Sequence, residues 1–305
     1  PNRMSQKSQT LSVPRGNRAL VRLGVRRERV DSDVGLALHD LPAGVHASPA
    51  LLPSDRFWIP MIVEATADAP QQGSLAGVTA TGQIDGDELT GGFEQIVDLV
   101  AESADRLFTG VRVDRLPVAV TAPVPFSIEM IEPTIPLPRD GSLMVRIDVN
   151  REPGFSEPIR VEFPFLPPWV VGESFVVIPA DRDHVWYQLE ARPEAAIRDW
   201  PFVAVARVDT LTATGDTTAL NGREVASQLV GLSVQDAPMS GAMDVIAAEQ
   251  GTVLEVVCRF QRSGELPESM QVELEGLPNR IVATAATIGQ AESEVKFSLE
   301  LADDA

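Results

Sequence analysis

Residues able to carry out chemistry are few and scattered in this sequence. The three histidines stand at positions 39, 46 and 184, and the only cysteine is Cys258. A serine hydrolase would need a Gly-x-Ser-x-Gly elbow, or a serine placed beside a histidine and a carboxylate. A zinc site would need clustered cysteine and histidine, and a phosphate site a glycine-rich loop. The sequence holds no such pentapeptide, cluster or loop. It therefore predicts a protein that is not an enzyme, with no catalytic residue and no cofactor-binding residue.

One acidic turn has the residue types of a metal site. Asp85, Asp87 and Glu88 stand together in the stretch Asp-Gly-Asp-Glu, and calcium prefers several carboxylate and carbonyl oxygens. The same stretch is also an ordinary hairpin turn, because aspartate and glycine tolerate the positive φ that such turns need. Asp181 and Asp183 form a second acidic turn of this kind, and Asp303 and Asp304 could join at the boundary of the third unit. Calcium is the only metal that the sequence suggests, and both interpretations stay open.

Four tryptophans offer a second kind of site. An exposed aromatic platform would bind a glycan or a peptide, whereas the plainer alternative is packing against a neighbouring unit or under a loop. The alternation of the surrounding residues predicts that Trp58 and Trp186 point outward. The other two are Trp169 and Trp200.

The elements that must position these residues come from a repeat. A glycine-containing turn precedes a Leu-Pro pair by nearly the same distance in three places: Gly16 to Pro42 and Gly141 to Pro167 span 26 positions, and Gly251 to Pro278 spans 27. A repeat with this period indicates a copied structural unit.

Each copy opens with two runs in which apolar and polar residues alternate. Period two over four to eight residues is typical of a half-buried strand. The first runs have apolar residues at 19, 21, 23 and 25, at 143, 145, 147 and 149, and at 254, 256, 258 and 260. The last of these sets places Cys258 on the inward side, so we expect it to be a small core residue. A third alternating run follows in each copy.

Short strands separated by Gly, Pro, Asp and Ser turns, with almost no helix signal, are typical of an immunoglobulin-like sandwich. The predicted fold class is all-β, with tandem immunoglobulin-like β-sandwiches. We expect a tail or linker over residues 1–10, sandwiches over 11–117 and 118–236, and a partial, truncated sandwich over 237–305 that contains three or four strands. Within the first sandwich, we expect the closing strand near residues 95–99.

Composition narrows the classes of partner. The 305 residues carry a net charge of -19 and are 44% hydrophobic, so packed cores are expected and anionic surfaces are repelled. We therefore expect no nucleic-acid partner. The sequence has no apolar run long enough to cross a bilayer, so we expect no membrane insertion. We read the chain as a fragment of a longer polypeptide.

Several stretches together resemble a known family. The openings Pro14-Arg15-Gly16 and Gly141-Ser142-Leu143, the turns over 41–45 and 67–70, and the stretches over 113–121 and 197–200 are similar to immunoglobulin-like repeats of large secreted bacterial proteins. Those proteins often carry a pre-peptidase C-terminal domain, and some are labelled subtilase-type peptidases. The chain departs from the pattern where Phe163–Trp169 replaces a Gly-Val turn and where Ala248–Gly251 replaces Pro-Arg-Gly.

The resemblance implies accessory repeats without catalytic residues. We therefore expect a non-catalytic spacer or adhesion-type module of a secreted or surface protein, located outside the cell, in the periplasm or on the cell surface. A protein or a glycan at the cell exterior is the expected partner. One alternative is an accessory region of a secreted serine peptidase whose catalytic domain lies outside this sequence, and another is a carbohydrate-binding module. The oligomeric state and the stiffness of the joints do not follow from the sequence.

Overall fold

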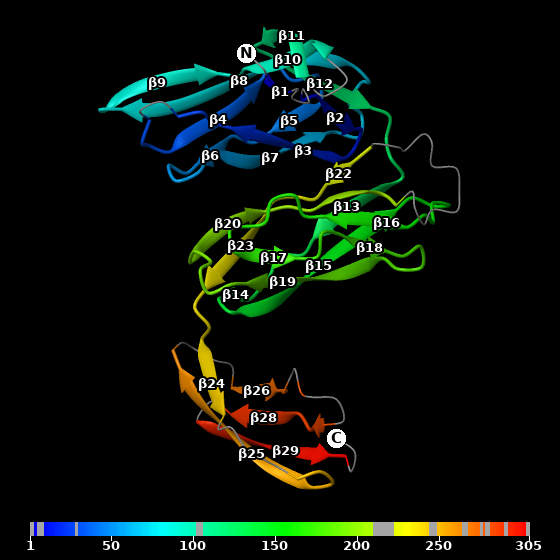
Figure 1. Cartoon of the computed structure of the whole chain (residues 1–305). Coiled ribbons are helices and arrows are strands. Elements are labelled where there is room, and N and C mark those ends of the chain that lie inside the picture. Colours follow the sequence, from blue (N-terminus) through cyan, green and yellow to red (C-terminus); the bar gives the residue numbers. More distant parts are fainter. Residues whose placement is uncertain are drawn as a thin grey trace.

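A computed structural model shows a chain built from strands and turns, in three units that follow one another along the molecule (Figure 1). It describes residues 3–4, 9–27, 30–101, 106–209, 223–243, 249–263, 268–274, 277, 281–289 and 292–302. The all-β prediction is confirmed for these residues, which form strands and turns and contain no helix.

The first unit is a sandwich of two sheets. One sheet has the order β2 (Leu11–Pro14), β12 (Leu116–Thr121), β8 (Gly73–Ile84), β4 (Val34–His39) and β6 (Ala50–Leu52). The other has the order β3 (Arg18–Gly24), β7 (Trp58–Ala65) and β5 (Val45–Ala47). The edge strand β2 runs parallel to β12, and every other pair in this unit is antiparallel.

An insertion between β8 and β12 extends from this sandwich. Strand β9 (Asp87–Gly92) folds back on β8, and β10 (Gln95–Ala101) pairs with β11 (Arg106–Val113), which also pairs with β1 (Arg3–Met4). The predicted closing strand near residues 95–99 therefore belongs to the insertion, and β12 closes the sandwich. Because β12 continues to Thr121, the first sandwich extends past the expected boundary at residue 117.

The second unit repeats this plan. One sheet consists of β13 (Phe126–Met130), β15 (Gly141–Arg151), β19 (His184–Ala191) and β17 (Val170–Gly172). The opposite layer contains β14 (Leu137–Pro138), β23 (Val230–Gln235) and β20 (Arg198–Phe202). A separate four-stranded sheet has the order β18 (Val176–Ile178), β16 (Ile159–Glu162), β21 (Val205–Val208) and β22 (Val225–Ala226).

The third unit has the same opening. One sheet orders β24 (Met239–Met243), β25 (Val253–Arg262), β29 (Glu294–Leu301) and β27 (Ile281–Ala283), and β26 (Ser269–Val272) pairs with β28 (Ala286–Gly289). The described residues thus form six strands, where three or four were expected. Strands β27 and β28 are among those not expected, and they are too short for an alternating pattern to be recognised.

The strand order defines immunoglobulin-like sandwiches. In such domains, strands A, B, E and D form one sheet and C, F and G the other. In the second unit, β15, β19 and β17 correspond to strands B, E and D. Strand β16 corresponds to C, β20 and β21 together to F, and β23 to G. In all three units two short strands follow strand C. The first of them pairs with strand E (β5, β17 and β27), and the second pairs with strand C (β6, β18 and β28). This shared detour confirms that one building block has been copied.

The turn before strand D keeps its geometry although its sequence changes. Gly44 has φ 74° and Trp169 has φ 66°, and each is followed by a residue whose N–H donates to a proline carbonyl three positions back. The replacement over Phe163–Trp169 therefore alters the residue and not the turn. A tryptophan in the left-handed region carries backbone strain that glycine does not.

The inward residues of the alternating runs form the cores. Val21, Met61 and Val63 are buried in the first unit, and Val145, Ile147 and Leu189 in the second. Cys258 is buried with Val295 and Phe297, as expected. Burial raises the pKa of the Cys258 thiol, so this sulfur is held in its unreactive protonated form.

Candidate functional site

The junction of the first two units is an apolar contact between their sheets. Leu20 and Ile62 are cross-strand partners on β3 and β7, and they face away from the core of the first unit. They pack against Phe165, Val203 and Ala226 of the second unit, all of which are buried. The outer face of one sandwich is thus covered by the end of the next.

Aromatic rings strengthen this contact. The rings of Trp58 and Phe165 lie with centroids 4.8 Å apart and planes inclined by 41°. The Arg56 guanidinium stands 3.5 Å from the centroid of Trp200, whose side chain is buried. A cation over an indole in a partly desolvated place contributes about 1–2 kcal/mol. Burial lowers the pKa of Arg56, although the group stays charged at neutral pH.

An ion pair crosses the same junction. Arg198 Nη2 donates to Asp55 Oδ2 over 2.6 Å. This hydrogen bond lowers the pKa of the Asp55 carboxyl and raises that of Arg198. Both side chains are substantially exposed, so the pair fixes orientation more than it adds stability.

A buried amide fastens the start of the second unit to the first. Asn17 follows the opening turn of the first unit and is 8% exposed. Its Nδ2 donates to the backbone carbonyl of Phe126, at the beginning of β13, over 2.9 Å. A buried carbonyl without such a donor would be costly, so this bond specifies where the second sandwich begins relative to the first.

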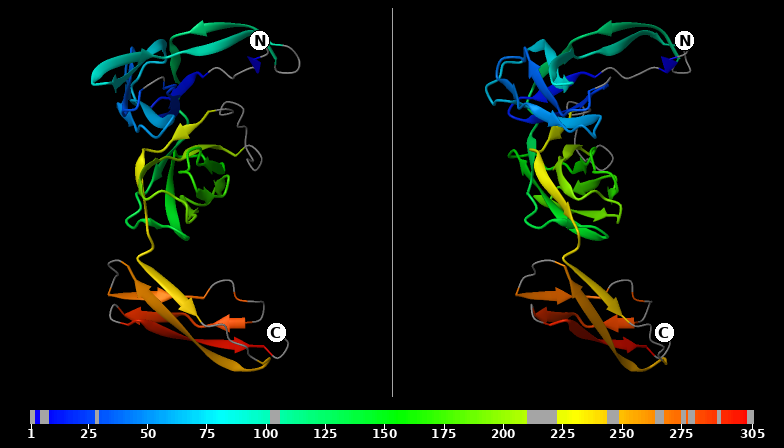
Figure 2. Two further views of the ribbon diagram at one scale, coloured as in Figure 1. Left: turned by 60° about the vertical axis from the view of Figure 1, so that its left-hand side comes forward. Right: turned by 90° about the vertical axis from the view of Figure 1, so that its left-hand side faces the viewer.

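The second junction is built differently. The chain passes from β23 to β24 as one extended segment, and the views from other sides agree (Figure 2). Ser263 of the third unit donates from its backbone nitrogen to Pro238 and from its hydroxyl to Ala237, over 2.9 and 2.7 Å. Arg139 of the second unit forms an ion pair with Asp236. These contacts hold the connecting segment to each neighbour in turn.

The proposed calcium residues of the first unit lie at the tip of the β8–β9 hairpin. Asp85 and Gly86 form its turn, with φ 52° and 90°, which is the left-handed pair that a tight hairpin requires. Asp87 and Glu88 are exposed and consecutive on β9, so their side chains leave opposite faces of the strand. Within the described ranges, no three His, Cys, Asp or Glu side chains gather as a metal site would need. Calcium binding here stays a prediction, and a calcium titration of the melting temperature tests it.

His39 belongs to a polar cluster with Asp40, Thr79 and Arg115. Its Nδ1 lies 3.0 Å from Asp40 Oδ2 and its Nε2 lies 3.1 Å from Thr79 Oγ1, and Arg115 also donates to Asp40 over 3.0 Å. Hydrogen bonds from His39 and Arg115 lower the pKa of Asp40. A hydroxyl, an imidazole and a carboxylate in this order resemble an acid–base relay. However, these side chains lie on the open face of the sheet, where water weakens electrostatic stabilisation.

The four tryptophans do not form a row. Trp200 is buried, and Trp58 packs on Phe165 of the second unit. These two tryptophans therefore follow the alternative in which the side chain packs against a neighbouring unit. Trp169 and Trp186 are 56% and 50% exposed. Trp169 lies beside Arg192, just past the end of β19, whereas Trp186 lies near its start. Six positions along a strand separate them by about 20 Å.

Comparisons with known proteins add little beyond the fold. No protein-family model and no curated protein matches the sequence. Among solved structures, the I9–I11 tandem of titin is 10% identical, with a TM-score of 0.21, over 99% of this chain and 89% of that one. The fibronectin(III)-like modules of CbhA from Clostridium thermocellum are 11% identical, with a TM-score of 0.22, over 76% and 94%. The D00–D0 domain of intimin is 10% identical, with a TM-score of 0.24, over 74% and 96%. At such TM-scores the immunoglobulin-like assignment rests on the strand order.

Two signals of the junction were present in the sequence. Leu20 and Ile62 are apolar at positions where alternation predicts outward, polar residues. Two apolar residues that are cross-strand partners and point away from their own core indicate a face that another surface covers.

The described part of the chain contains no helix suited to crossing a membrane.

Proposed function

We propose that this chain is a non-catalytic structural and interaction module whose first two sandwiches act as one stiff spacer. Its place would be in a secreted or surface protein, outside the cell or in the periplasm. The observation that supports this proposal is the junction, where an apolar contact, an aromatic pair and the Asn17 hydrogen bond all join the first two units.

A stiff pair of units followed by a looser joint suits a spacer. The first junction buries side chains from both partners, so bending it would expose apolar surface to water. The second junction depends on contacts of the connecting segment around Asp236–Pro238. The net charge of -19 makes neighbouring copies repel one another. The module would therefore hold its first two units at a fixed spacing and let the third unit reorient.

Distance measurements between spin labels test this proposal in the full chain. Labels would be placed on exposed strand or turn positions with Gln72→Cys, Met144→Cys and Gln261→Cys, in pairs, on a Cys258→Ser background. The pair at 72 and 144 spans the first junction and the pair at 144 and 261 spans the second. We expect a narrow distance distribution for the first pair and a broad one for the second.

A control pair within the second unit gives the width that the labels themselves contribute; Met144→Cys with Arg192→Cys serves this purpose. A first-junction distribution much wider than this control would overturn the stiff spacer. Equal, narrow widths at both junctions would contradict the looser second joint.

A further inference from the structure

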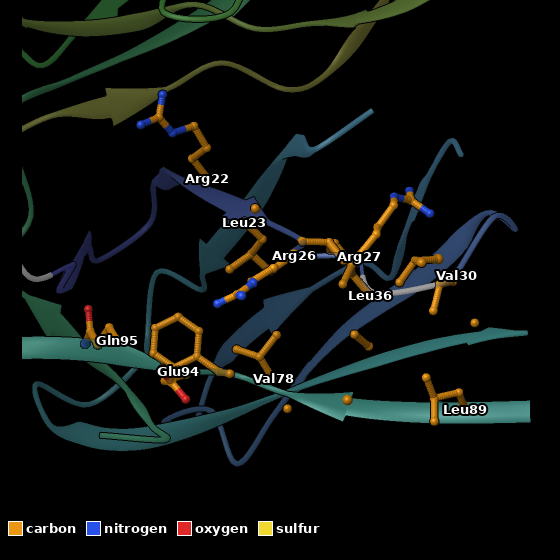
Figure 3. Close-up of a pocket in the computed structure, with 18 of the residues that line it drawn as sticks. Arg22, Leu23, Arg26, Arg27, Val30, Leu36, Val78, Leu89, Glu94 and Gln95 are labelled. Carbon is orange, nitrogen blue, oxygen red and sulfur yellow. The ribbon is translucent and has the colours of Figure 1, made fainter. Parts of the chain in front are cut away.

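The first unit contains a cavity of about 610 Å³ at one end of its sandwich. It lies between the end of β3 and the β8–β9 hairpin, where the two sheets diverge and the insertion begins (Figure 3). We call it the first-unit cavity. Sites for small molecules commonly have volumes of about 300–1,000 Å³, so this space is large enough for a ligand.

The floor of the first-unit cavity is apolar. Leu23, Val34, Leu36 and Val78 line it and also belong to the buried core of the unit. Leu89 on β9 extends this surface outward and is 46% exposed. The four floor residues are at most 8% exposed, so the apolar surface left for a ligand is that of Leu89 and of the partly buried Val30, Ala80 and Phe93. Covering that surface contributes about 25 cal/mol for each Å².

The rim of the cavity is cationic, in contrast to the protein as a whole. Among the residues that the structure describes, four arginines and one glutamate line the cavity, whereas the chain carries a net charge of -19. Arg112 pairs with that glutamate, Glu94, over 2.9 Å. Figure 3 shows Arg26 extending across the cavity toward the side of Glu94 and Gln95, while Arg22 and Arg27 point away. An anionic group entering the cavity would thus meet the Arg26 guanidinium.

One wall is held rigid by Arg27. Its guanidinium donates to four backbone carbonyls of the neighbouring loops, those of Ser32, Leu52, Pro53 and Arg56. On the opposite side, Gln9 and Gln95 exchange two hydrogen bonds, which fasten the chain before β2 to β10. The cavity is therefore bounded by fixed elements, as a preformed site requires.

Glycines keep the cavity open. Gly82, Gly91 and Gly92 all line it. Gly91 pairs with the lining residue Ala80, and a Cβ added at Gly91 would lie 3.8 Å from the Ala80 Cβ, which is ordinary van der Waals contact. The φ of Gly91 is not in the left-handed range, so a larger side chain there would point to the cavity side without backbone strain.

We propose that the first-unit cavity binds an amphipathic anion, a single hydrocarbon chain that ends in a carboxylate. The carboxylate forms a salt bridge with Arg26, and the chain lies on Leu89, Val30 and Phe93, above the buried floor. The charge contrast between the rim and the rest of the protein favours an anion over a cation, and the apolar floor favours a hydrocarbon tail over a small inorganic anion. This site goes beyond the proposed spacer function and does not depend on it.

Calorimetric titration of the full chain with dodecanoate and with dodecyltrimethylammonium tests the proposal. Both probes have the same tail and opposite charge, and both are used below their micelle concentration. We expect one dodecanoate to bind for each chain, at least tenfold more tightly than the cation, and more weakly at high salt because Arg26 is exposed and screened. Equal affinity for the two probes, or no binding of dodecanoate, would overturn the proposal.

Two variants locate the site. Gly91→Leu fills the cavity, because Gly91 pairs with the lining residue Ala80, and it should weaken dodecanoate binding at least tenfold. Gly35→Leu is its control, because Gly35 lies between two lining residues of β4 but faces the other side of the sheet. Arg26→Gln should reduce the preference for dodecanoate over the cation severalfold, whereas Arg182→Gln in the second unit should leave it unchanged. Wild-type binding by Gly91→Leu with an unchanged melting temperature would show that the ligand lies elsewhere and would overturn the assignment.

Discussion

The indole of Trp58 and the phenyl ring of Phe165 meet with their centroids 4.8 Å apart, although the two residues come from different units of the chain. Phe165 is also the centre of the apolar contact with Leu20 and Ile62. One residue of the second unit therefore joins the aromatic and aliphatic parts of the junction, and its removal should uncouple the two sandwiches.

We expect Phe165→Ala to destabilise the joined pair by about 3 kcal/mol or more, since the substitution leaves a cavity in a packed contact. The first two units should unfold in one urea transition in the wild type and in two in the variant. Trp186→Ala is the matched control, because this indole is 50% exposed on β19 and should cost less than about 0.5 kcal/mol. A single transition in both variants would contradict the role of Phe165.

Asn17→Ala should destabilise the protein by about 1–3 kcal/mol, because it leaves the Phe126 carbonyl without its donor in a buried place. Urea unfolding measures this change. Asn150→Ala provides the comparison, since Asn150 is exposed and its loss should be nearly neutral. If the two alanine variants were equally stable, the Asn17 bond would not contribute to the junction.

The cores followed from the sequence because a half-buried strand reveals its inward residues by alternation. Val21, Val145 and Val256 were all on the predicted inward side and are buried. The junction did not follow: Leu20 and Ile62 are apolar at outward positions, but the sequence does not show that the neighbouring unit covers them. A pattern within one strand does not state what lies across its outer face.

Two other differences have the same origin. Strand β10 alternates as a sandwich strand does, yet it pairs with β11 in the insertion, since sheet membership depends on the partner strand. The cavity was also invisible in the sequence, because Arg26 and Leu89 are distant in the chain and line one cavity only in the folded unit. Trp169 shows the reverse case, in which a turn was retained although its glycine was not.

The Asp55–Arg198 pair makes the junction sensitive to acid. The hydrogen bond from Arg198 lowers the pKa of Asp55 from its ordinary value of 3.8. A carboxyl with a lowered folded-state pKa contributes stability above its unfolded pKa and loses it as the pH falls through the folded value. A carbon-13 titration of the Asp55 carboxyl should therefore give a midpoint below 3.8. Arg198→Gln should move it upward; an unchanged midpoint would mean that the pair does not form in solution.

Relieving the strain at Trp169 should stabilise the second unit. A side chain in the left-handed region costs about 1–2 kcal/mol, and glycine avoids this at an entropic cost of about 0.5–1 kcal/mol. We therefore expect Trp169→Gly to raise the free energy of unfolding by about 0.5–1 kcal/mol. Trp169→Ala keeps the strain and loses the indole, so it should give no gain. A gain of the same size in both variants would assign the effect to the indole instead of the backbone.

Tyr187 gives a spectroscopic signal that belongs to one residue, because it is the only tyrosine in the chain. Its ring is 1% exposed and stacks on Phe163, with centroids 3.9 Å apart. Its hydroxyl donates to the Glu173 carbonyl over 2.6 Å. Burial raises the pKa of Tyr187 to about 12, and the nearby Glu173 carboxylate acts in the same direction.

Ultraviolet titration of tyrosinate should give a midpoint of about 12 in the folded protein, compared with about 10 in the unfolded chain. Since the folded-state pKa is raised, the contribution of this group to stability is complete below about pH 10 and is lost as the pH rises toward the folded value. Tyr187→Phe should remove this part of the alkaline pH dependence and cost about 1 kcal/mol at neutral pH through the lost hydrogen bond. Other groups also titrate at alkaline pH, so the difference between the wild type and this variant is the measurement that isolates Tyr187. A midpoint near 10 in the folded protein would show that water reaches the hydroxyl and that β17 does not cover it.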